Sequence, residues 1–141
     1  MEPSIQTPRP RLLLVDDEPD ILDFLERALR RRYEVRRCCS AREALGELER
    51  CSADVLLTDQ MMPQRTGLDL LAEVAERWPD TVRVLISGFT EVRQLADALA
   101  VSRIHNFVLK PVDSQRLLEA LDVATTRRSG STSPARGTRA G

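Results

Sequence analysis

Short apolar runs alternate with amphipathic segments five times along this chain, and this alternation strongly constrains its fold. Continuous apolar runs such as RLLLV (11–15) and DVLLTD (54–59) are typical of strands buried on both faces. Further strands are predicted over 33–38, 82–87 and 105–110, and the polar content of the first of these favours a position near the sheet edge. Because crossovers between parallel strands are right-handed, the pattern predicts an α/β fold, a doubly wound five-stranded parallel sheet covered by helices on both faces.

The helices between these strands are predicted from apolar residues at helical spacing and from residues that begin or end helices. Ser40 and Glu43 form the S-x-x-E pattern of a capping box, which predicts a helix through about residue 50. The first helix is expected over 20–32, with its apolar face formed by Ile21, Phe24, Leu25, Ala28 and Leu29. The remaining helices are expected over 67–78, from Thr90 to about Val101, and from Asp113 to about Thr126.

The 141 residues have the length of one ordinary domain. We expect a flexible segment over 1–10, a folded domain over 11–127 and a disordered basic tail or linker over 128–141, which is too rich in Ser, Gly, Arg, Thr and Pro to bury a core. The net charge is −1, and four arginines but no acid follow Thr126, which leaves −5 on residues 1–125. An acidic domain argues against nucleic-acid binding by the domain itself.

The chain has no apolar run near the ~18–20 residues that a membrane span needs. Its first residues, MEPSIQTPRPR, contain no apolar signal core, so a cytoplasmic protein that does not enter a membrane is expected. The three cysteines Cys38, Cys39 and Cys51 have neither an even number nor a C-x-x-C spacing. This pattern is typical of small apolar fillers and not of a disulfide framework or a zinc site.

Charged and polar side chains stand at the carboxyl ends of four predicted strands. Asp16 and Asp17 follow the first strand, Asp59 ends the third, Ser87 ends the fourth and Lys110 ends the fifth. In doubly wound folds the ligand site lies at this edge of the sheet. Each residue alone is also a common turn or cap former, so the functional interpretation depends on the set as a whole.

Carboxylates gathered at one edge repel one another, which raises their pKa values unless a cation lies among them. Mg²⁺ prefers oxygen ligands, typically one or two carboxylates with waters and phosphate oxygens. The sequence therefore predicts Mg²⁺ bound by Asp17 and Asp59, with Asp16 binding directly or through water. A nearby ammonium and hydroxyl would complete a cradle for phosphoryl oxygens, and a carboxylate left free by the metal could accept the phosphoryl group as a nucleophile.

Lys110 is the only lysine of the chain, which contains twenty arginines. A compact ammonium on a four-carbon stem acts as a point charge in a crowded acidic pocket, whereas a planar guanidinium is wider and suits bidentate pairing. Pro111 follows directly, and a cis bond before it would turn the chain so that the lysine faces the pocket. We therefore expect Lys110 to project into the acidic site.

Four motifs occur in the order and spacing of the receiver domain of two-component response regulators: LLVDDEPDI, VLLTDQMMPQRTGLDLL, VLISGFT and NFVLKPVD. The chain resembles this family over about 11–127, which implies the flavodoxin-like (βα)5 receiver fold. The resemblance implies that Asp59 accepts a phosphoryl group from a histidine of a partner, either a sensor histidine kinase or a phosphotransfer protein. Asp16 and Asp17 match the acidic pair that holds Mg²⁺, and the backbone carbonyl of Met61 matches a further ligand.

The same resemblance implies a signalling switch and not an enzyme. Lys110 matches the lysine that pairs with the phosphoryl group, and Ser87 matches the hydroxyl that turns inward to bond it. Phe107 matches the switch aromatic; a core role alone stays an alternative, because buried aromatics are common in any strand. Phosphorylation would then change the surface of the fourth helix, fifth strand and fifth helix, which could bind a downstream protein, a fused output domain or a second copy. Candidate residues of that face are Val92, Leu95, Leu99 and the exposed arginines nearby, although helical spacing explains the apolar ones as core equally well.

Met61 and Phe89 occupy the two family positions that flank the water responsible for hydrolysing the aspartyl phosphate. Both are bulky and apolar, so slow self-dephosphorylation is expected. His105, the only histidine, stands at the start of a strand and away from the predicted pocket, which argues against a Ser-His-Asp or Cys-His site.

Two alternative functions remain open at this point. A phosphatase of the haloacid dehalogenase type also uses an aspartate nucleophile and a lysine, but it carries a D-x-D pair where this chain has Asp16-Asp17-Glu18. The second alternative is a degenerate receiver that acts as an unphosphorylated docking or dimerisation module. The complete set of acids, hydroxyl and lysine argues against it, because an adaptor would not need Lys110.

Overall fold

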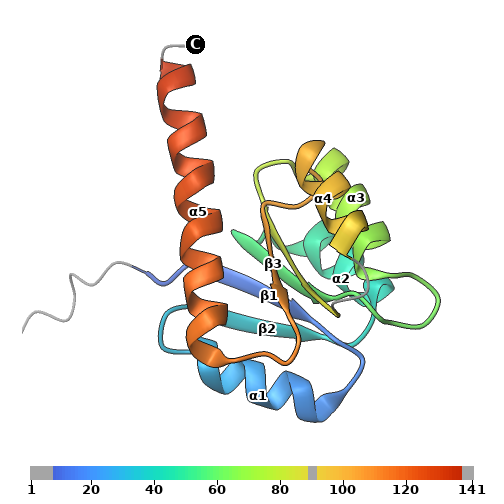
Figure 1. The fold of residues 1–141 in the computed structure, drawn as a ribbon. Coiled ribbons are helices and arrows are strands. Elements are labelled where there is room, and N and C mark those ends of the chain that lie inside the picture. Colours follow the sequence, from blue (N-terminus) through green and yellow to red (C-terminus); the bar gives the residue numbers. More distant parts are fainter. Residues whose placement is uncertain (1–7, 89–91, 138–141) are drawn as a thin grey trace, which may run out of the picture.

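The computed structural model describes residues 8–88 and 92–137, with side chains described for 8–88 and 93–126. Strands and helices alternate along this part of the chain, as the sequence predicts (Figure 1). The strands are β1 (Arg11–Val15), β2 (Glu34–Cys38), β3 (Val55–Asp59), β4 (Val82–Ser87) and β5 (Asn106–Leu109). The helices are α1 (Pro19–Leu29), α2 (Ala41–Arg50), α3 (Gly67–Arg77), α4 (Val92–Ala100) and α5 (Ser114–Gly137).

All neighbouring strands pair in parallel, in the order β2-β1-β3-β4-β5. This order confirms the predicted doubly wound sheet and the edge position of the polar strand 34–38. The register pairs Asp59 with Ile86 and Ser87 with Leu109, so the strands end at one common edge. On the β2 edge, Arg36 forms an ion pair with Glu47 of α2.

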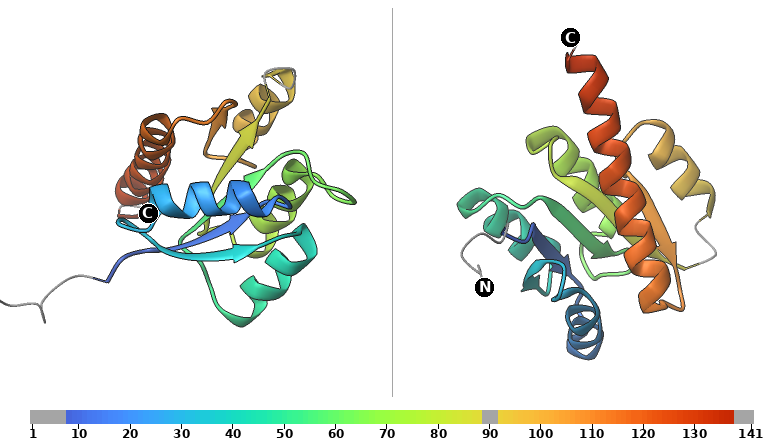
Figure 2. Two further views of the ribbon diagram at one scale, coloured as in Figure 1. Left: turned by 90° about the horizontal axis from the view of Figure 1, so that it is seen from below. Right: turned by 90° about the vertical axis from the view of Figure 1, so that its left-hand side faces the viewer.

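Two hydrophobic clusters cover the two faces of the sheet. Residues of α1 and α5 pack on one face with alternate strand residues such as Leu14 and Leu57. The helices α2, α3 and α4 pack on the other face with the intervening residues, including Leu13 and Leu56. Figures 1 and 2 show the same division, with α1 and α5 on one side of the sheet. Each apolar residue of β1 and β3 belongs to one of these two clusters, which explains the continuous apolar runs of the sequence.

The apolar face of α1 differs from the prediction. Leu22, Leu25 and Leu29 are buried, whereas Ile21 and Phe24 are 38% and 40% exposed. Helical spacing fits both sets of residues, and only the docking angle of the helix on the sheet decides between them. The assignment of Ile21 and Phe24 to the core was therefore wrong.

Side-chain caps begin three of the helices. Ser40 Oγ accepts a hydrogen bond from the Glu43 N–H (3.0 Å), which confirms the predicted cap of α2. Glu43 in turn accepts from the backbone N–H of Cys39, one residue earlier than a standard capping box requires. Thr66 caps α3, and Asp113 accepts from the Gln115 N–H at the start of α5. Thr90, the predicted cap of α4, lies outside the described residues.

Helix α5 is longer than the sequence predicts. Its buried residues Leu117, Leu121 and Ala124 end near the expected boundary at Thr126, yet the helix continues to Gly137 and projects beyond the sheet (Figure 2). Once several turns are packed, helical hydrogen bonds can propagate without an apolar face, so the composition of 128–137 did not reveal its helix. The domain boundary at residue 127 stays a prediction. In the described part of the chain, no helix is long and apolar enough to span a membrane.

Candidate functional site

Asp59 lies at the end of β3 and is 4% exposed. Its Oδ2 accepts a hydrogen bond from the Met61 N–H at 3.0 Å, and its Oδ1 lies 2.8 Å from Lys110 Nζ as an ion pair. Among the described residues, the Lys110 ammonium is the single partner of this buried oxygen. Burying a carboxylate oxygen in this way costs free energy, which a further cationic ligand would offset.

Asp16 and Asp17 follow β1 and face Asp59. One carboxylate oxygen from each of the three residues lies within 4.8 Å of the others. Asp16 is buried and accepts a hydrogen bond from the Glu18 N–H at 2.9 Å, while Asp17 is exposed. Burial raises the pKa of Asp16 to about 6; the Glu18 N–H partly offsets this, and the charges of Asp59 and Asp17 add to it. Three converging carboxylate oxygens fit the ligand preferences of a hard divalent cation, which would also relieve their repulsion.

Lys110 enters the site from the opposite side, at the end of β5. Its backbone N–H donates to the Ser87 carbonyl at 2.9 Å, and the peptide bond to Pro111 is cis, as predicted. Burial lowers the pKa of Lys110, but the attraction of Asp59, Asp16 and Glu18 outweighs it, and the pKa lies above its ordinary value. The side chain is therefore an ammonium at neutral pH, as a point-charge role requires.

Ser87 and Phe107 lie on neighbouring strands. Ser87 is fully buried, and its hydroxyl donates to the Gly88 carbonyl at 3.2 Å. Phe107 is half-buried and packs against the core layer of α2, α3 and α4. Leu95, a candidate for the output face, is 1% exposed and belongs to that core, so the core alternative is correct for Leu95. The side chains of Val92 and Phe89 lie outside the described residues.

The arrangement of acids and lysine can be compared with known families. The family model of the response regulator receiver domain matches residues 12–122. The chain belongs to this family.

Two curated relatives of this receiver domain are regulatory proteins. The chain is 38% identical over 110 residues to the hydrogenase transcriptional regulatory protein HoxA of Cupriavidus necator, covering 78% of this chain and 23% of that protein. It is 35% identical over 122 residues to the response regulator protein PilR of Pseudomonas aeruginosa, covering 86% of this chain and 27% of that protein. The receiver domain thus spans about a quarter of the length of these relatives.

A solved receiver structure supports the same assignment. The signal receiver domain of an HD domain-containing protein from Pseudomonas fluorescens Pf-5 is 32% identical, with a TM-score of 0.78 and coverage of 86% of this chain and 98% of that one. This match confirms the predicted receiver fold.

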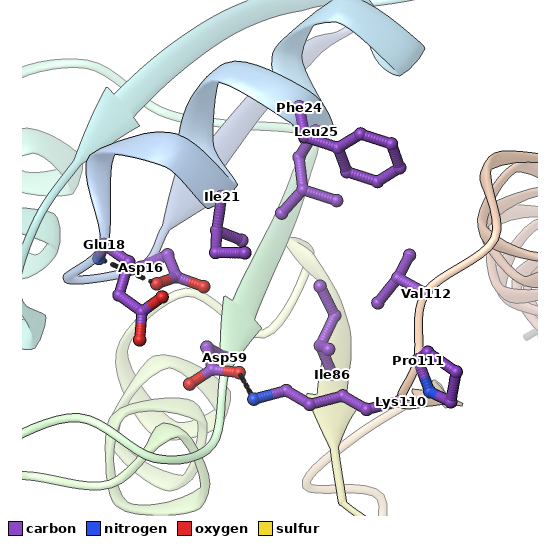
Figure 3. Close-up of a pocket in the computed structure, with 10 residues that line it drawn as sticks. All are labelled: Asp16, Glu18, Ile21, Phe24, Leu25, Asp59, Ile86, Lys110, Pro111 and Val112. Atoms are coloured by element: carbon purple, nitrogen blue, oxygen red, sulfur yellow. Dashed lines mark hydrogen bonds and ion pairs between the residues drawn. The ribbon is translucent and has the colours of Figure 1, made fainter.

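The receiver site opens into a pocket of about 280 Å³ with two different walls. One wall is charged: Figure 3 shows Asp16 and Asp59, with Lys110 reaching toward Asp59 from the side opposite Asp16. The other wall is apolar and comes from α1, β4 and the segment after β5: Ile21, Phe24, Leu25, Ile86, Pro111 and Val112. The sequence did not predict this wall, since Ile21 and Phe24 were assigned to the core.

Gly67, the first residue of α3, fits closely behind Asp59. A Cβ atom at this position would lie 2.4 Å from the Asp59 carbonyl oxygen and 2.7 Å from Leu85 Cδ1. Real Cβ contacts are not that short, so only glycine lets the helix begin this close to β3. The sequence pattern marked Gly67 only as a helix boundary.

The opposite end of β4 buries a second charge. Arg83 is 4% exposed, and its guanidinium donates to the backbone carbonyls of Pro79, Thr81, Ser102 and Arg103 at 2.8–3.2 Å. His105 Nδ1 accepts from the Arg83 N–H at 2.9 Å. The only histidine therefore has a structural role at the end of the sheet away from the acidic pocket.

Proposed function

We propose that this receiver domain accepts a phosphoryl group on Asp59 in a Mg²⁺-dependent reaction and so switches a signalling output. The observation that carries the proposal is the buried Asp59 Oδ1, whose single partner among the described residues is the Lys110 ammonium at 2.8 Å. Two further carboxylates offer oxygens within 4.8 Å. A carboxylate so arranged is held ready for a cation and for an incoming phosphoryl group.

In the proposed reaction, an oxygen of Asp59 attacks the phosphorus of a phosphohistidine on a sensor histidine kinase or phosphotransfer protein. The new O–P bond forms as the P–N bond breaks, and the histidine nitrogen leaves with the electron pair. Asp16, Asp17, Asp59 and the Met61 carbonyl would hold Mg²⁺, which when bound neutralises charge on the phosphoryl oxygens. The Lys110 ammonium neutralises charge from the other side of the pocket.

The output follows from the phosphoryl group, which carries about −1.5 to −2 charges at neutral pH in place of the single charge of the Asp59 carboxylate. The Ser87 hydroxyl, which now donates to the Gly88 carbonyl, would turn to donate to the phosphoryl oxygens. That turn would move the segment after β4, and Phe107 would follow it as the switch aromatic. The changed surface of α4, β5 and α5 would then bind a downstream protein, a fused output domain or a second copy.

The apolar wall of the pocket supports docking of the phosphodonor protein. Phe24 is 40% exposed and lines the same pocket as the acids, where an apolar side chain of the donor could cover it. Phe24→Ser should slow phosphotransfer from a donor protein about tenfold while leaving phosphorylation by acetyl phosphate unchanged. Val123→Ser, at an exposed apolar position (47%) outside the pocket, is the matched control. Equal slowing with acetyl phosphate would contradict the docking role.

Intact-protein mass spectrometry after incubation with Mg²⁺ and acetyl phosphate tests the function itself. We expect one phosphoryl addition, absent from Asp59→Asn and from samples treated with a chelator. Repeated turnover of a phosphomonoester would instead favour a phosphatase. No addition to folded protein would favour a docking module.

The same time course measures how long the phosphoryl group persists. Met61 is 62% exposed beside Asp59, where its side chain can hinder the attacking water. We expect a long-lived phosphoprotein, and a half-life of seconds would contradict this. The cytoplasmic location stays a prediction.

A further inference from the structure

Gln60, the residue after Asp59, is a buried polar side chain that neither the motifs nor the charge pattern singled out. It is 5% exposed and uncharged. A buried amide is stable only when its polar atoms are paired. Its hydrogen bonds therefore indicate what it holds in place.

The bonds of Gln60 join three parts of the site. Its Oε1 accepts from the Leu68 N–H at 2.8 Å, and its carbonyl accepts from the Gly67 N–H at 3.0 Å. Its own N–H donates to the Ile86 carbonyl of β4 at 2.9 Å. The first N–H groups of a helix have no partner within the helix. Gln60 therefore caps two of them on α3 while remaining tied to the sheet.

These bonds hold together the two ends of the segment between Gln60 and Gly67. It contains Met61, whose N–H holds Asp59 Oδ2 at 3.0 Å and whose carbonyl is the proposed metal ligand. Because Gly67 has no Cβ atom, α3 can begin close to the Asp59 carbonyl, and the two ends of the segment lie close together. The position of Asp59 and of the Met61 carbonyl thus depends on the capping amide.

We propose that Gln60 is a positioning residue for phosphoryl acceptance, because its side-chain carbonyl fixes the Met61–Thr66 segment to α3. This rests on the proposed function of Asp59. Gln60 does not contact the phosphoryl group; it acts through Met61 and Asp59. Residues that orient metal ligands typically change metal affinity or activity by about 10–100-fold when replaced.

Comparing Gln60→Met with Gln60→Glu separates the effect of the hydrogen-bond acceptor from the effect of side-chain size. Methionine keeps the length of the side chain but leaves the Leu68 N–H without an acceptor. Glutamate restores an acceptor, and its charge suits a helix N-terminus. Gln115→Met makes the same change at an exposed position of α5.

The affinity for Mg²⁺ is measured by calorimetry, and the rate of phosphorylation is measured as a function of Mg²⁺ and acetyl phosphate. For Gln60→Met we expect about tenfold weaker Mg²⁺ binding and a lower rate even at saturating Mg²⁺. The Leu68 amide should also exchange its hydrogen faster. Gln60→Glu should return Mg²⁺ affinity to within about threefold of the wild type, and Gln115→Met should change nothing.

The proposal is overturned if Gln60→Met binds Mg²⁺ and accepts phosphate like the wild type, or if Gln60→Glu is as impaired as Gln60→Met. If Gln60→Met does not fold, Gln60→Asn gives the same test, because its shorter amide cannot reach Leu68. A wild-type protein that binds Mg²⁺ but is not phosphorylated would refute the proposed function, while the Mg²⁺ affinities would still test Gln60. A wild type that binds no Mg²⁺ would overturn both.

Discussion

The two ends of the sheet both bury charge, but they treat it differently. At the amino end of β4, the Arg83 guanidinium donates to four backbone carbonyls. At the carboxyl end, Asp59 Oδ1 has a single partner among the described residues, the Lys110 ammonium. A buried charge that is fully bonded supports the fold, whereas one left open costs stability until a ligand arrives. The amino end of β4 therefore has a structural role, and the carboxyl end is left available for binding.

Replacing Arg83 should have the largest effect on stability. Arg83→Met removes the donors that tie the segment after α3 to the segment after α4, and four carbonyls lose a partner. We expect a loss of about 3 kcal/mol or more in the free energy of unfolding, measured by urea denaturation. Arg103→Met, at an exposed side chain of the same segment, is the control and should cost under about 0.5 kcal/mol. A loss below about 1 kcal/mol for Arg83→Met would contradict the structural role of the Arg83 guanidinium.

Two glycine substitutions test how closely α3 packs behind Asp59. Gly67→Ala would place its Cβ atom 2.4 Å from the Asp59 carbonyl oxygen, so β3 or α3 must move. We expect a loss of about 2 kcal/mol despite the higher helix propensity of alanine, together with weaker Mg²⁺ binding. Gly46→Ala lies within α2 with nothing within 4 Å, and should instead gain about 0.5–1 kcal/mol. If both substitutions stabilise the protein, α3 does not pack against the Asp59 carbonyl as closely as the structure indicates.

Asp16→Asn should stabilise the metal-free protein, in contrast to Arg83→Met. The pKa of Asp16 is raised from 3.8 to about 6 by burial and by the neighbouring acids, so its ionised form is disfavoured in the fold. Such a shift corresponds to about 3 kcal/mol, or about 1–2 kcal/mol after allowance for solvent screening. Asparagine keeps an acceptor for the Glu18 N–H and removes the charge.

The pH dependence gives the sign of this effect. Because the folded-state pKa of Asp16 is raised, the folded protein holds the proton more tightly than the unfolded chain. Stability is greatest at low pH, falls as the pH rises from about 4 to about 6, and is constant above that range as far as Asp16 is concerned. The advantage of Asp16→Asn should therefore be full at pH 7.5 and vanish near pH 4. Asp97→Asn, at an exposed site on α4, should show no such profile; an Asp16→Asn variant that is less stable at pH 7.5 would contradict the strain assigned to this edge.

The sequence predicts the fold well because its signals are local and consistent. Apolar runs mark the strands, and the parallel order follows from the handedness of the crossovers. The clustering of Asp16, Asp17, Asp59 and Lys110 was predictable for the same reason, since strand ends share one edge of a parallel sheet.

What the sequence did not predict depends on contacts between distant segments. Helical spacing could not decide between Leu22 and Phe24 as the buried side of α1, because that depends on how the helix docks. Arg83 reads as an interruption of an apolar strand until the carbonyls of two distant turns surround it. Gln60 is uncharged and belongs to no apolar pattern, and its role is seen only in its hydrogen bond with the Leu68 N–H. The helix beyond residue 126 has no apolar pattern to announce it.

The edges of the sheet also determine how copies of this protein can meet. An exposed edge strand offers backbone N–H and C=O groups to a strand of another molecule, and charged side chains or short strands oppose such pairing. The β2 edge carries Arg36, bound to Glu47, and Arg37, bound to Asp23 and Glu26, while β5 has only 4 residues. Adding a strand at β2 would compete with these ion pairs, and β5 offers a short ladder. Both edges of the sheet therefore oppose growth into extended sheets.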